Sequence, residues 1–216
     1  MPQIFRPRAN AITRLALVAA ACLLPAAAIL AVALTSSPYA TGVGSVPQQP
    51  VPFSHQHHVA GLGIDCQYCH TTTDRSSFAG LPDTATCMTC HSRLWTRADL
   101  LAPVRASYES NKPLAWTRVH DLADFVYFNH RSHVTNGIGC ESCHGRVDTM
   151  PLIRQVEPLT MQWCLDCHRD PMPHLRPANA ITVMGYDLGE ASEQRQLARD
   201  YNLQFDRLTE CVTCHR

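Results

Sequence analysis

The sequence predicts a mainly helical, loop-rich fold with a single N-terminal helix that spans a membrane. Residues 15–34 form an unbroken apolar run, and a run of about 20 residues is the length that crosses a bilayer as a helix. The rest of the 216-residue chain carries five copies of a short cysteine and histidine motif. Repeated motifs at this density leave little sequence for an ordinary apolar core. We therefore expect short helices and long loops, without a continuous sheet.

Composition narrows the class of protein. The chain has 18 basic and 18 acidic residues, and this balance argues against a nucleic-acid partner, which normally meets a basic surplus. Charged residues make up 17% of the chain, too few for a long charged and disordered tail. The 11 cysteines are an odd number, which excludes a fully paired set of disulfides.

The N-terminus predicts an uncleaved membrane anchor. Residues 1–14 contain three arginines and no acid, so by the positive-inside rule they lie in the cytoplasm. The apolar run 15–34 is longer than the 7–15 residues usual in a secretory signal, although a cleaved signal or a lipid anchor at Cys22 is an alternative. We expect a single-pass protein of the bacterial inner (cytoplasmic) membrane, with the remaining chain on the periplasmic side.

Residues 35–52 are expected to form a linker. They hold four prolines and two glycines, and no charged residue occurs between Arg14 and Asp65. Such a segment is typical of an extended stalk rather than of a core element. The outer domain then comprises residues 53–216, in which residues 99–110 and 190–201 are predicted to be helices from their periodicity.

Ten of the eleven cysteines lie in the pattern C-x-x-C-H. The first to fifth motifs are Cys66, Cys69 and His70; Cys87, Cys90 and His91; Cys140, Cys143 and His144; Cys164, Cys167 and His168; Cys211, Cys214 and His215. This pattern is the attachment signature of c-type haem. The two thiols bond to the porphyrin, and the imidazole is the proximal ligand of its iron. The sequence thus predicts five covalently bound haem c groups.

Zinc is the alternative for this pattern. The gap between the first two motifs, and that between the third and the fourth, would each suit a four-cysteine zinc site. A histidine follows every second cysteine, however, and the fifth motif would have no partner. Thiols on the oxidising outer side are also expected to oxidise. Haem is therefore the preferred interpretation.

A second repeat precedes two of the motifs. Residues 53–59 and 128–134 both follow the pattern F-x-H-x-x-H-V, and two C-x-x-C-H motifs come after each block. The chain therefore contains a duplicated two-haem unit, here called the first repeat (53–91) and the second repeat (128–168). The fifth haem is predicted at 211–215.

These blocks supply candidates for the second, distal ligand of each iron. Two histidines three positions apart lie on neighbouring sides of a turn, so two haems can flank one segment. The predicted distal ligands are His55, His58, His130 and His133. His57 is not expected to be a ligand, because Ser132 occupies its place in the second repeat.

The fifth distal ligand is left open by the sequence. His120, shortly before the second repeat, is the preferred candidate. The alternatives are His174, Met150, Met161, Met172 and Met184, since a histidine and methionine pair is also a stable environment for haem iron.

The blocks resemble those of the class III multihaem cytochromes, c3 and c7. In that family the first histidine of the block binds the haem of the following motif, and the second binds another haem. The resemblance implies that His55 serves the haem of His70 and that His130 serves the haem of His144. It implies that His58 and His133 reach other haems.

A wider resemblance is to the pentahaem cytochrome subunit of alternative complex III, a quinol:electron acceptor oxidoreductase. It rests on residues 119–130 and 161–169, on the membrane-type N-terminus and on the ending Cys214-His215-Arg216. The resemblance implies integral membrane and iron–sulfur subunits as partners. It also implies a soluble acceptor, either a monohaem cytochrome c or a copper protein.

The function expected from these observations is electron relay. If every iron holds two protein ligands, no coordination position is open to a substrate, so no catalytic residue is predicted and enzymatic activity of the chain itself is left open. The alternatives are a self-sufficient quinol dehydrogenase, like the membrane-anchored tetrahaem proteins that feed periplasmic reductases, and a multihaem reductase with one open haem site.

Overall fold

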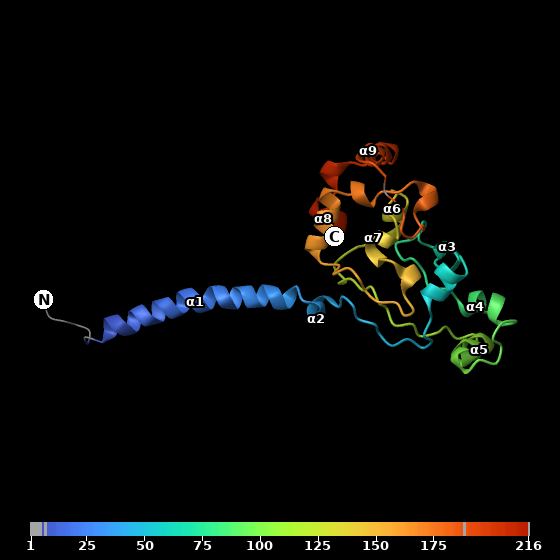
Figure 1. Cartoon of the computed structure of the whole chain (residues 1–216), viewed down its shortest axis with the longest axis horizontal. Coiled ribbons are helices and arrows are strands. Elements are labelled where there is room, and N and C mark those ends of the chain that lie inside the picture. Colours follow the sequence, from blue (N-terminus) through green and yellow to red (C-terminus); the bar gives the residue numbers. More distant parts are fainter. Residues whose placement is uncertain (1–5, 7, 188, 216) are drawn as a thin grey trace. The chain divides into compact units, whose positions relative to one another are not determined.

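The computed structural model describes all residues of the chain except 1–5, 7, 188 and 216. The chain divides into two compact units, Met1–Gly42 and Val43–Arg216, which are described separately below (Figure 1). The described residues are mainly helical and form no named strand; an isolated bridge joins Ile138 and Leu175. The predicted fold class is therefore confirmed.

The N-terminal unit consists of α1 (Ala9–Thr35) and the short α2 (Pro38–Thr41). None of the described residues of α1 is buried. The helix is long and apolar enough to cross a membrane, and an anchor and a signal sequence both meet this description. Pro25 lies inside it, which membrane helices tolerate.

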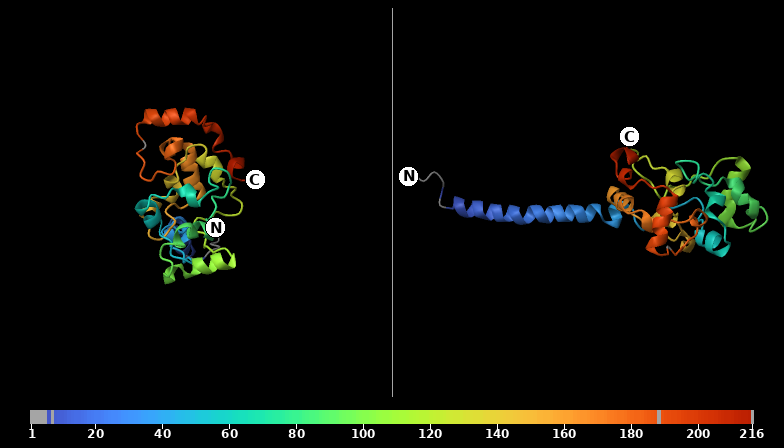
Figure 2. Two further views of the ribbon diagram at one scale, coloured as in Figure 1. Left: turned by 90° about the vertical axis from the view of Figure 1, so that its right-hand side faces the viewer. Right: turned by 90° about the horizontal axis from the view of Figure 1, so that it is seen from above.

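The second unit is built from short helices joined by loops (Figures 1 and 2). In chain order its elements are η1 (Gln56–Gly61), α3 (Cys66–Cys69), α4 (Thr84–His91), η2 (Asp99–Leu101), α5 (Ala102–Ser110), α6 (His130–Val134), α7 (Glu141–His144), η3 (Val147–Thr149), α8 (Met161–Arg169), η4 (Met172–His174), η5 (Ala178–Ala180), α9 (Ala191–Asp200), η6 (Phe205–Arg207) and α10 (Cys211–Cys214). The helices predicted over 99–110 and 190–201 are formed by η2 with α5 and by α9.

Side-chain caps explain where three of these helices begin. Asp65 accepts a hydrogen bond from the backbone N–H of Gln67, and Asp83 accepts one from Thr86, each at 2.8 Å. Thr160 caps α8 in the same way. Each cap satisfies a helix N–H that has no partner within the helix. Local sequence therefore starts the turns that carry the first, second and fourth motifs.

The apolar core of this unit is small. A cluster of buried side chains contains Val51, Leu101 and Val104, and Met150 and Leu175 are fully buried elsewhere. The helices that carry the motifs, by contrast, have no buried residue among those described. Figures 1 and 2 place α4 and α5 at one end of the unit, and the C-terminus on a different side.

Candidate haem-binding sites

All five C-x-x-C-H motifs fold as helical turns. They lie on α3, α4, α7, α8 and α10. Residues three apart on a helix point to the same side, so each turn presents its two thiols together. In the first, third and fifth motifs the backbone N–H of the histidine donates to the carbonyl of the first cysteine at 2.9–3.0 Å. One turn thus offers both thiols and the imidazole from one place.

The cysteines do not form the zinc site considered above. All eleven are unpaired. Among the described residues, no three side chains of histidine, cysteine, aspartate or glutamate gather closely enough to hold a metal ion by themselves. Burial raises the pKa of the Cys143 thiol to about 12.

Four motif histidines have their ring orientation fixed by a backbone carbonyl. The Nδ1 atoms of His70, His91, His168 and His215 lie 2.7, 3.2, 2.6 and 3.0 Å from the carbonyl oxygens of Gly80, Leu94, Leu208 and Phe125, respectively. A carbonyl can only accept, so Nδ1 must carry the hydrogen. The lone pair is then on Nε2, which is the state of an imidazole that binds a metal.

The F-x-H-x-x-H blocks have the same geometry in both repeats. His58 stacks on Phe53 with ring centroids 4.3 Å apart, and His133 stacks on Phe128 at 4.6 Å. The first histidine of each block meets the same phenylalanine edge-on, at 4.9 and 4.8 Å. One phenylalanine thus holds two imidazoles on different sides of a single turn.

Three pairs of histidines have the centroid spacing of two axial ligands. Metal–imidazole bonds are about 2 Å long, so two imidazoles on opposite faces of one ion place their ring centroids roughly 6 Å apart. The centroid distances are 6.3 Å for His58 and His91, 6.3 Å for His130 and His144, and 6.1 Å for His133 and His168. Each pair joins a block histidine to a motif histidine, so these residues fit a haem iron between them.

His55 lies within electrostatic range of His70. Burial first, and then the neighbouring His70 and His58, lower the pKa of His55 to about 4. Burial likewise lowers the pKa of His144 to about 3 and lowers the pKa of His133. A neutral imidazole keeps the lone pair that iron needs.

The structure places His120 beside the third motif. Its ring centroid is 4.3 Å from that of His144, and its buried Nε2 has no hydrogen-bond partner among the residues that the structure describes. The ring that stacks against His215 is Phe125, at 5.9 Å. His120, the preferred candidate for the fifth distal ligand, therefore lies near the third motif and not near the fifth motif.

The other candidates are scattered. His57 is exposed and lies against Trp95, with ring centroids 5.8 Å apart. His174 lines a cavity of about 280 Å³ together with Cys143 and Cys167. Met150 is fully buried, whereas Met161 is 65% exposed. Met172 lines a separate cavity, and Met184 is half-buried.

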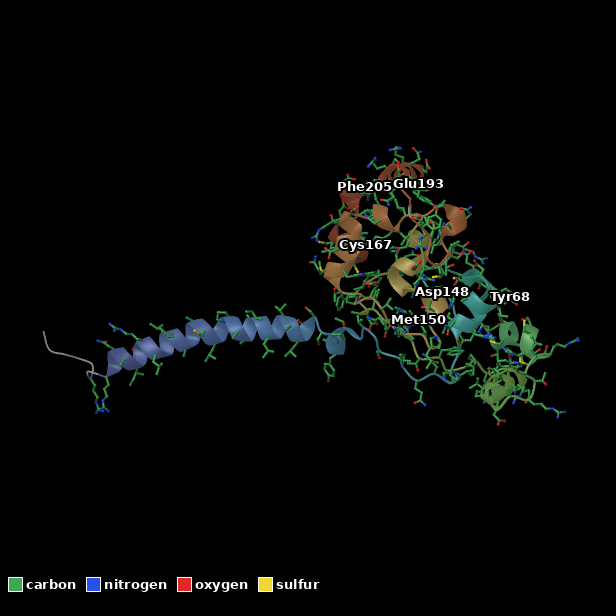
Figure 3. The ribbon with its side chains drawn as sticks, viewed as in Figure 1. Tyr68, Asp148, Met150, Cys167, Glu193 and Phe205 are labelled. Carbon is green, nitrogen blue, oxygen red and sulfur yellow. The ribbon has the colours of Figure 1, made fainter. Side chains whose placement is uncertain are left out.

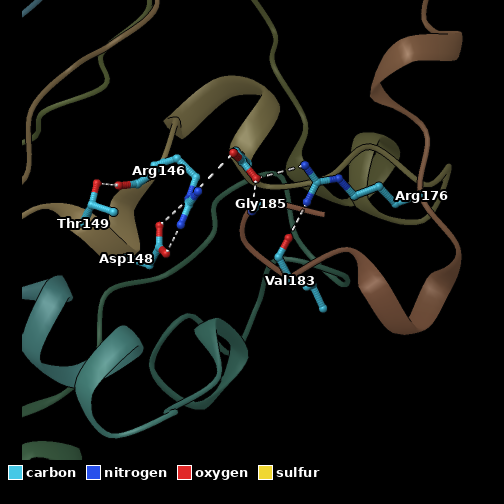
Figure 4. Close-up of polar contacts among 7 residues, drawn as sticks. Arg146, Asp148, Thr149, Arg176, Val183 and Gly185 are labelled. Carbon is cyan, nitrogen blue, oxygen red and sulfur yellow. Dashed lines mark hydrogen bonds and ion pairs between the residues drawn. The ribbon is translucent and has the colours of Figure 1, made fainter. Parts of the chain in front are cut away.

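An ion-pair network that the sequence did not reveal surrounds the third motif (Figure 4). Glu141, within the motif, accepts hydrogen bonds from Arg176 at 3.1 Å and from the N–H of Gly185 at 2.6 Å. Arg146 forms two hydrogen bonds to Asp148 and lowers the pKa of that carboxyl. Arg176 and Gly185 lie 35 and 44 residues from Glu141 along the chain, so no local pattern could have identified them.

Two parts of the chain match families of known proteins. Residues 126–216 match the family described as cytochrome c7 and related cytochrome c, and residues 33–113 match the class III cytochrome c family. Each matched span contains one F-x-H-x-x-H block.

A curated relative is similar over part of the chain. Over 101 residues the chain is 39% identical to the protein named menaquinone reductase, multiheme cytochrome c subunit, from Nitratidesulfovibrio vulgaris strain Hildenborough. The similarity spans 46% of this chain and 47% of the relative, which is about half the length of each. The motifs, the histidine geometry and the family matches lead to one conclusion: this chain carries multihaem cytochrome c domains of the class III and c7 type, which bind haem c covalently and transport electrons.

Proposed function

We propose that the chain is a pentahaem electron-transfer subunit, anchored by α1 in the bacterial inner membrane with residues 53–216 on the periplasmic side. The observation that carries this proposal is the spacing of 6.1–6.3 Å within three block-to-motif histidine pairs. An iron between two such imidazoles has no open position for a substrate. Each haem would then supply reversible uptake of one electron.

The ligand assignment follows from the same contacts. Each motif binds one haem c through its two cysteines and its histidine. The distal partners are His55 for His70, His58 for His91, His130 for His144 and His133 for His168. Backbone carbonyls on Nδ1 orient the rings and increase their basicity, which is how surrounding groups tune a bound metal. For the fifth haem, the candidates are His120, which lies beside the third motif, His174 and the four methionines.

The electron source is proposed to be a quinol. The similarity to a menaquinone reductase subunit and the resemblance to the alternative complex III subunit both support quinol-linked electron transfer. The partners would then be integral membrane and iron–sulfur subunits of one complex. A soluble carrier, a monohaem cytochrome c or a copper protein, would accept the electrons.

A reductase with one open haem is the second candidate. It is favoured by the position of His120 beside His144 and by the stacking of Phe125 on His215. An open fifth iron would bind cyanide or carbon monoxide and change its absorption spectrum. If protein ligands occupy both axial positions of every iron, neither cyanide nor carbon monoxide should change the absorption spectrum.

The proposal is tested on the complex purified from its native membrane. The denatured subunit should have the mass of the polypeptide plus five haem groups, and a water-soluble menaquinol analogue should reduce its haems. Fewer than five additions would contradict the assignment of the motifs. Five additions without reduction by the quinol would contradict the proposed electron source.

A further inference from the structure

We propose that the five haems form a single row in the order second, first, third, fourth and fifth motif, so that electrons enter and leave through the second and fifth haems. This inference rests on the proposed function, because it takes each motif to hold one haem. The order differs from the order of the motifs along the chain. It follows from four contacts between motifs and from the exposure of the cysteines.

The first contact joins the second motif to the first. The hydroxyl of Tyr68, inside the first motif, is 3.1 Å from the hydroxyl of Thr89, inside the second. Their distal ligands, His55 and His58, both contact Phe53, the first edge-on and the second by stacking. The two haems of the first repeat therefore flank the same turn.

The second contact joins the first motif to the third. Ile181 and Thr182 are consecutive residues of one loop, and their carbonyl groups contact the first cysteine of the third motif and of the first motif, respectively. The backbone N–H of Cys140 donates to the carbonyl of Ile181 at 3.0 Å, and the thiol of Cys66 lies 3.9 Å from the carbonyl of Thr182. The pKa of the Cys140 thiol is also raised, by its contact with Cys66 and by burial. The first haem is therefore next to both the second and the third.

The third contact joins the third motif to the fourth. His130 and His133 lie on the single turn α6, and they face the histidines of the third and fourth motifs, respectively. Cys143 and Cys167 line the same cavity of about 280 Å³. Figure 3 labels Cys167 on α8, in the fourth motif, and Tyr68 on α3, in the first.

The fourth contact joins the fourth motif to the fifth. The Nδ1 atom of His168 is 2.6 Å from the carbonyl of Leu208, three residues before the fifth motif. The backbone N–H of Tyr127 donates to the carbonyl of Cys214 at 2.9 Å, which fastens the fifth motif to the segment that leads into α6. The fifth haem is therefore next to the fourth.

Exposure identifies the two ends of the row. Of the ten motif cysteines, Cys90 in the second motif and Cys211 in the fifth are exposed, and the other eight are partly buried. An exposed thioether edge is the part of a haem that a partner protein can approach. Figures 1 and 2 show α4 and the C-terminus on different sides of the unit, which agrees with their being the two ends of a row.

A structure of the complete, haem-loaded complex by electron cryomicroscopy tests the order directly. Each iron is identified by the two cysteines bonded to its porphyrin. We expect the nearest iron to that of the second motif to belong to the first motif, and the nearest iron to that of the fifth motif to belong to the fourth. Any other nearest neighbour would overturn the row. Motifs without haem would instead overturn the proposed function.

A kinetic experiment tests the ends. The variants His58→Met and His133→Met change the same position of the two repeats, and methionine ligation raises the potential of one haem so that it titrates separately. Photoreduced flavin is then mixed with the oxidised protein. In His58→Met, the rate of reduction of the second haem should rise in proportion to flavin concentration. In His133→Met, the rate of reduction of the fourth haem should reach a plateau, because its electrons arrive from other haems. The opposite result would overturn the assignment of the ends.

Discussion

The two repeats place their second histidine alike. In each repeat its Nδ1 donates at 2.8 Å to the carbonyl four residues earlier, which belongs to Ser54 for His58 and to Asn129 for His133. Both bonds lie within one turn of chain. The orientation of this ligand is therefore determined locally, by the block itself.

The first histidine is held differently. The Nδ1 atom of His130 donates to the carbonyl of Ser77 at 2.9 Å, a residue contributed by the first repeat. The Nδ1 atom of His55 is buried and has no hydrogen-bond partner among the described residues. A hydrogen bond at this atom makes the imidazole a stronger donor to iron. The two repeats therefore keep a histidine at this position, but contacts with distant parts of the chain give His130 a hydrogen bond that His55 lacks.

The largest expected effect is that of removing the second histidine of either F-x-H-x-x-H block. His58→Ala and His133→Ala each remove one ligand of a facing pair, so each variant should convert one haem of the five from low spin to high spin. Low-temperature electron paramagnetic resonance of the oxidised protein measures the change. His57→Ala is the matched control and should remain low spin, because that residue has no counterpart in the second repeat. A high-spin signal from His57→Ala alone would contradict the assignment.

The second largest effect concerns a motif position at which the repeats differ. The second repeat has Glu141 where the first has Gln67. Glu141→Gln leaves the guanidinium of Arg176, which is 5% exposed, without its charged partner. Breaking a buried ion pair in this way should lower the free energy of unfolding by about 3 kcal/mol, as measured by denaturant titration of the holoprotein.

The exposed Gln67 provides the control for this variant. Gln67→Glu should change the free energy of unfolding by less than about 0.5 kcal/mol, because substitutions at exposed positions are usually nearly neutral. If Glu141→Gln and Gln67→Glu lowered the free energy of unfolding equally, the ion pair between Glu141 and Arg176 would not be specifically stabilising.

The phenylalanine of each block should matter equally in both repeats. Phe53→Ala and Phe128→Ala remove a partly buried ring that stacks on one imidazole and meets another edge-on. Each should lower the free energy of unfolding by about 2 kcal/mol. Thermal unfolding of the two variants in parallel checks this. A loss confined to one repeat would contradict their shared geometry.

The smallest expected effect is that of mild acid. The folded pKa of His55 is lowered to about 4, so between about pH 6.5 and pH 4 the unfolded chain binds a proton that the folded chain does not. Stability is therefore lost as the pH falls through this window. From pH 7 to pH 5.5 the loss due to His55 should be about 1 kcal/mol. Urea titrations at the two pH values measure it, and a gain in stability in acid would contradict the burial of neutral histidines.

Short-range features of the molecule could be predicted from the sequence. The apolar run gave α1, the periodic segments gave α5 and α9, and a fixed motif spacing places its residues on one helical turn. Each of these depends on residues a few positions apart. The same holds for the two imidazoles that share one phenylalanine.

Long-range features could not be predicted. The carbonyl of Leu208 that orients His168 is a backbone group, and backbone groups leave no trace in the residue types. The pairing of Glu141 with Arg176 and the approach of Cys66 to Cys140 depend on how loops cross in space. The sequence predicts His120 as a fifth distal ligand but does not indicate which motif it serves. Its position beside His144 depends on the same long-range packing.

The central claim is that imidazoles of this chain occupy both faces of its haem irons. Low-temperature electron paramagnetic resonance of the oxidised, haem-loaded wild-type chain tests it most directly. The account predicts low-spin ferric signals for at least the four haems of the two repeats. High-spin signals from two or more irons would contradict it.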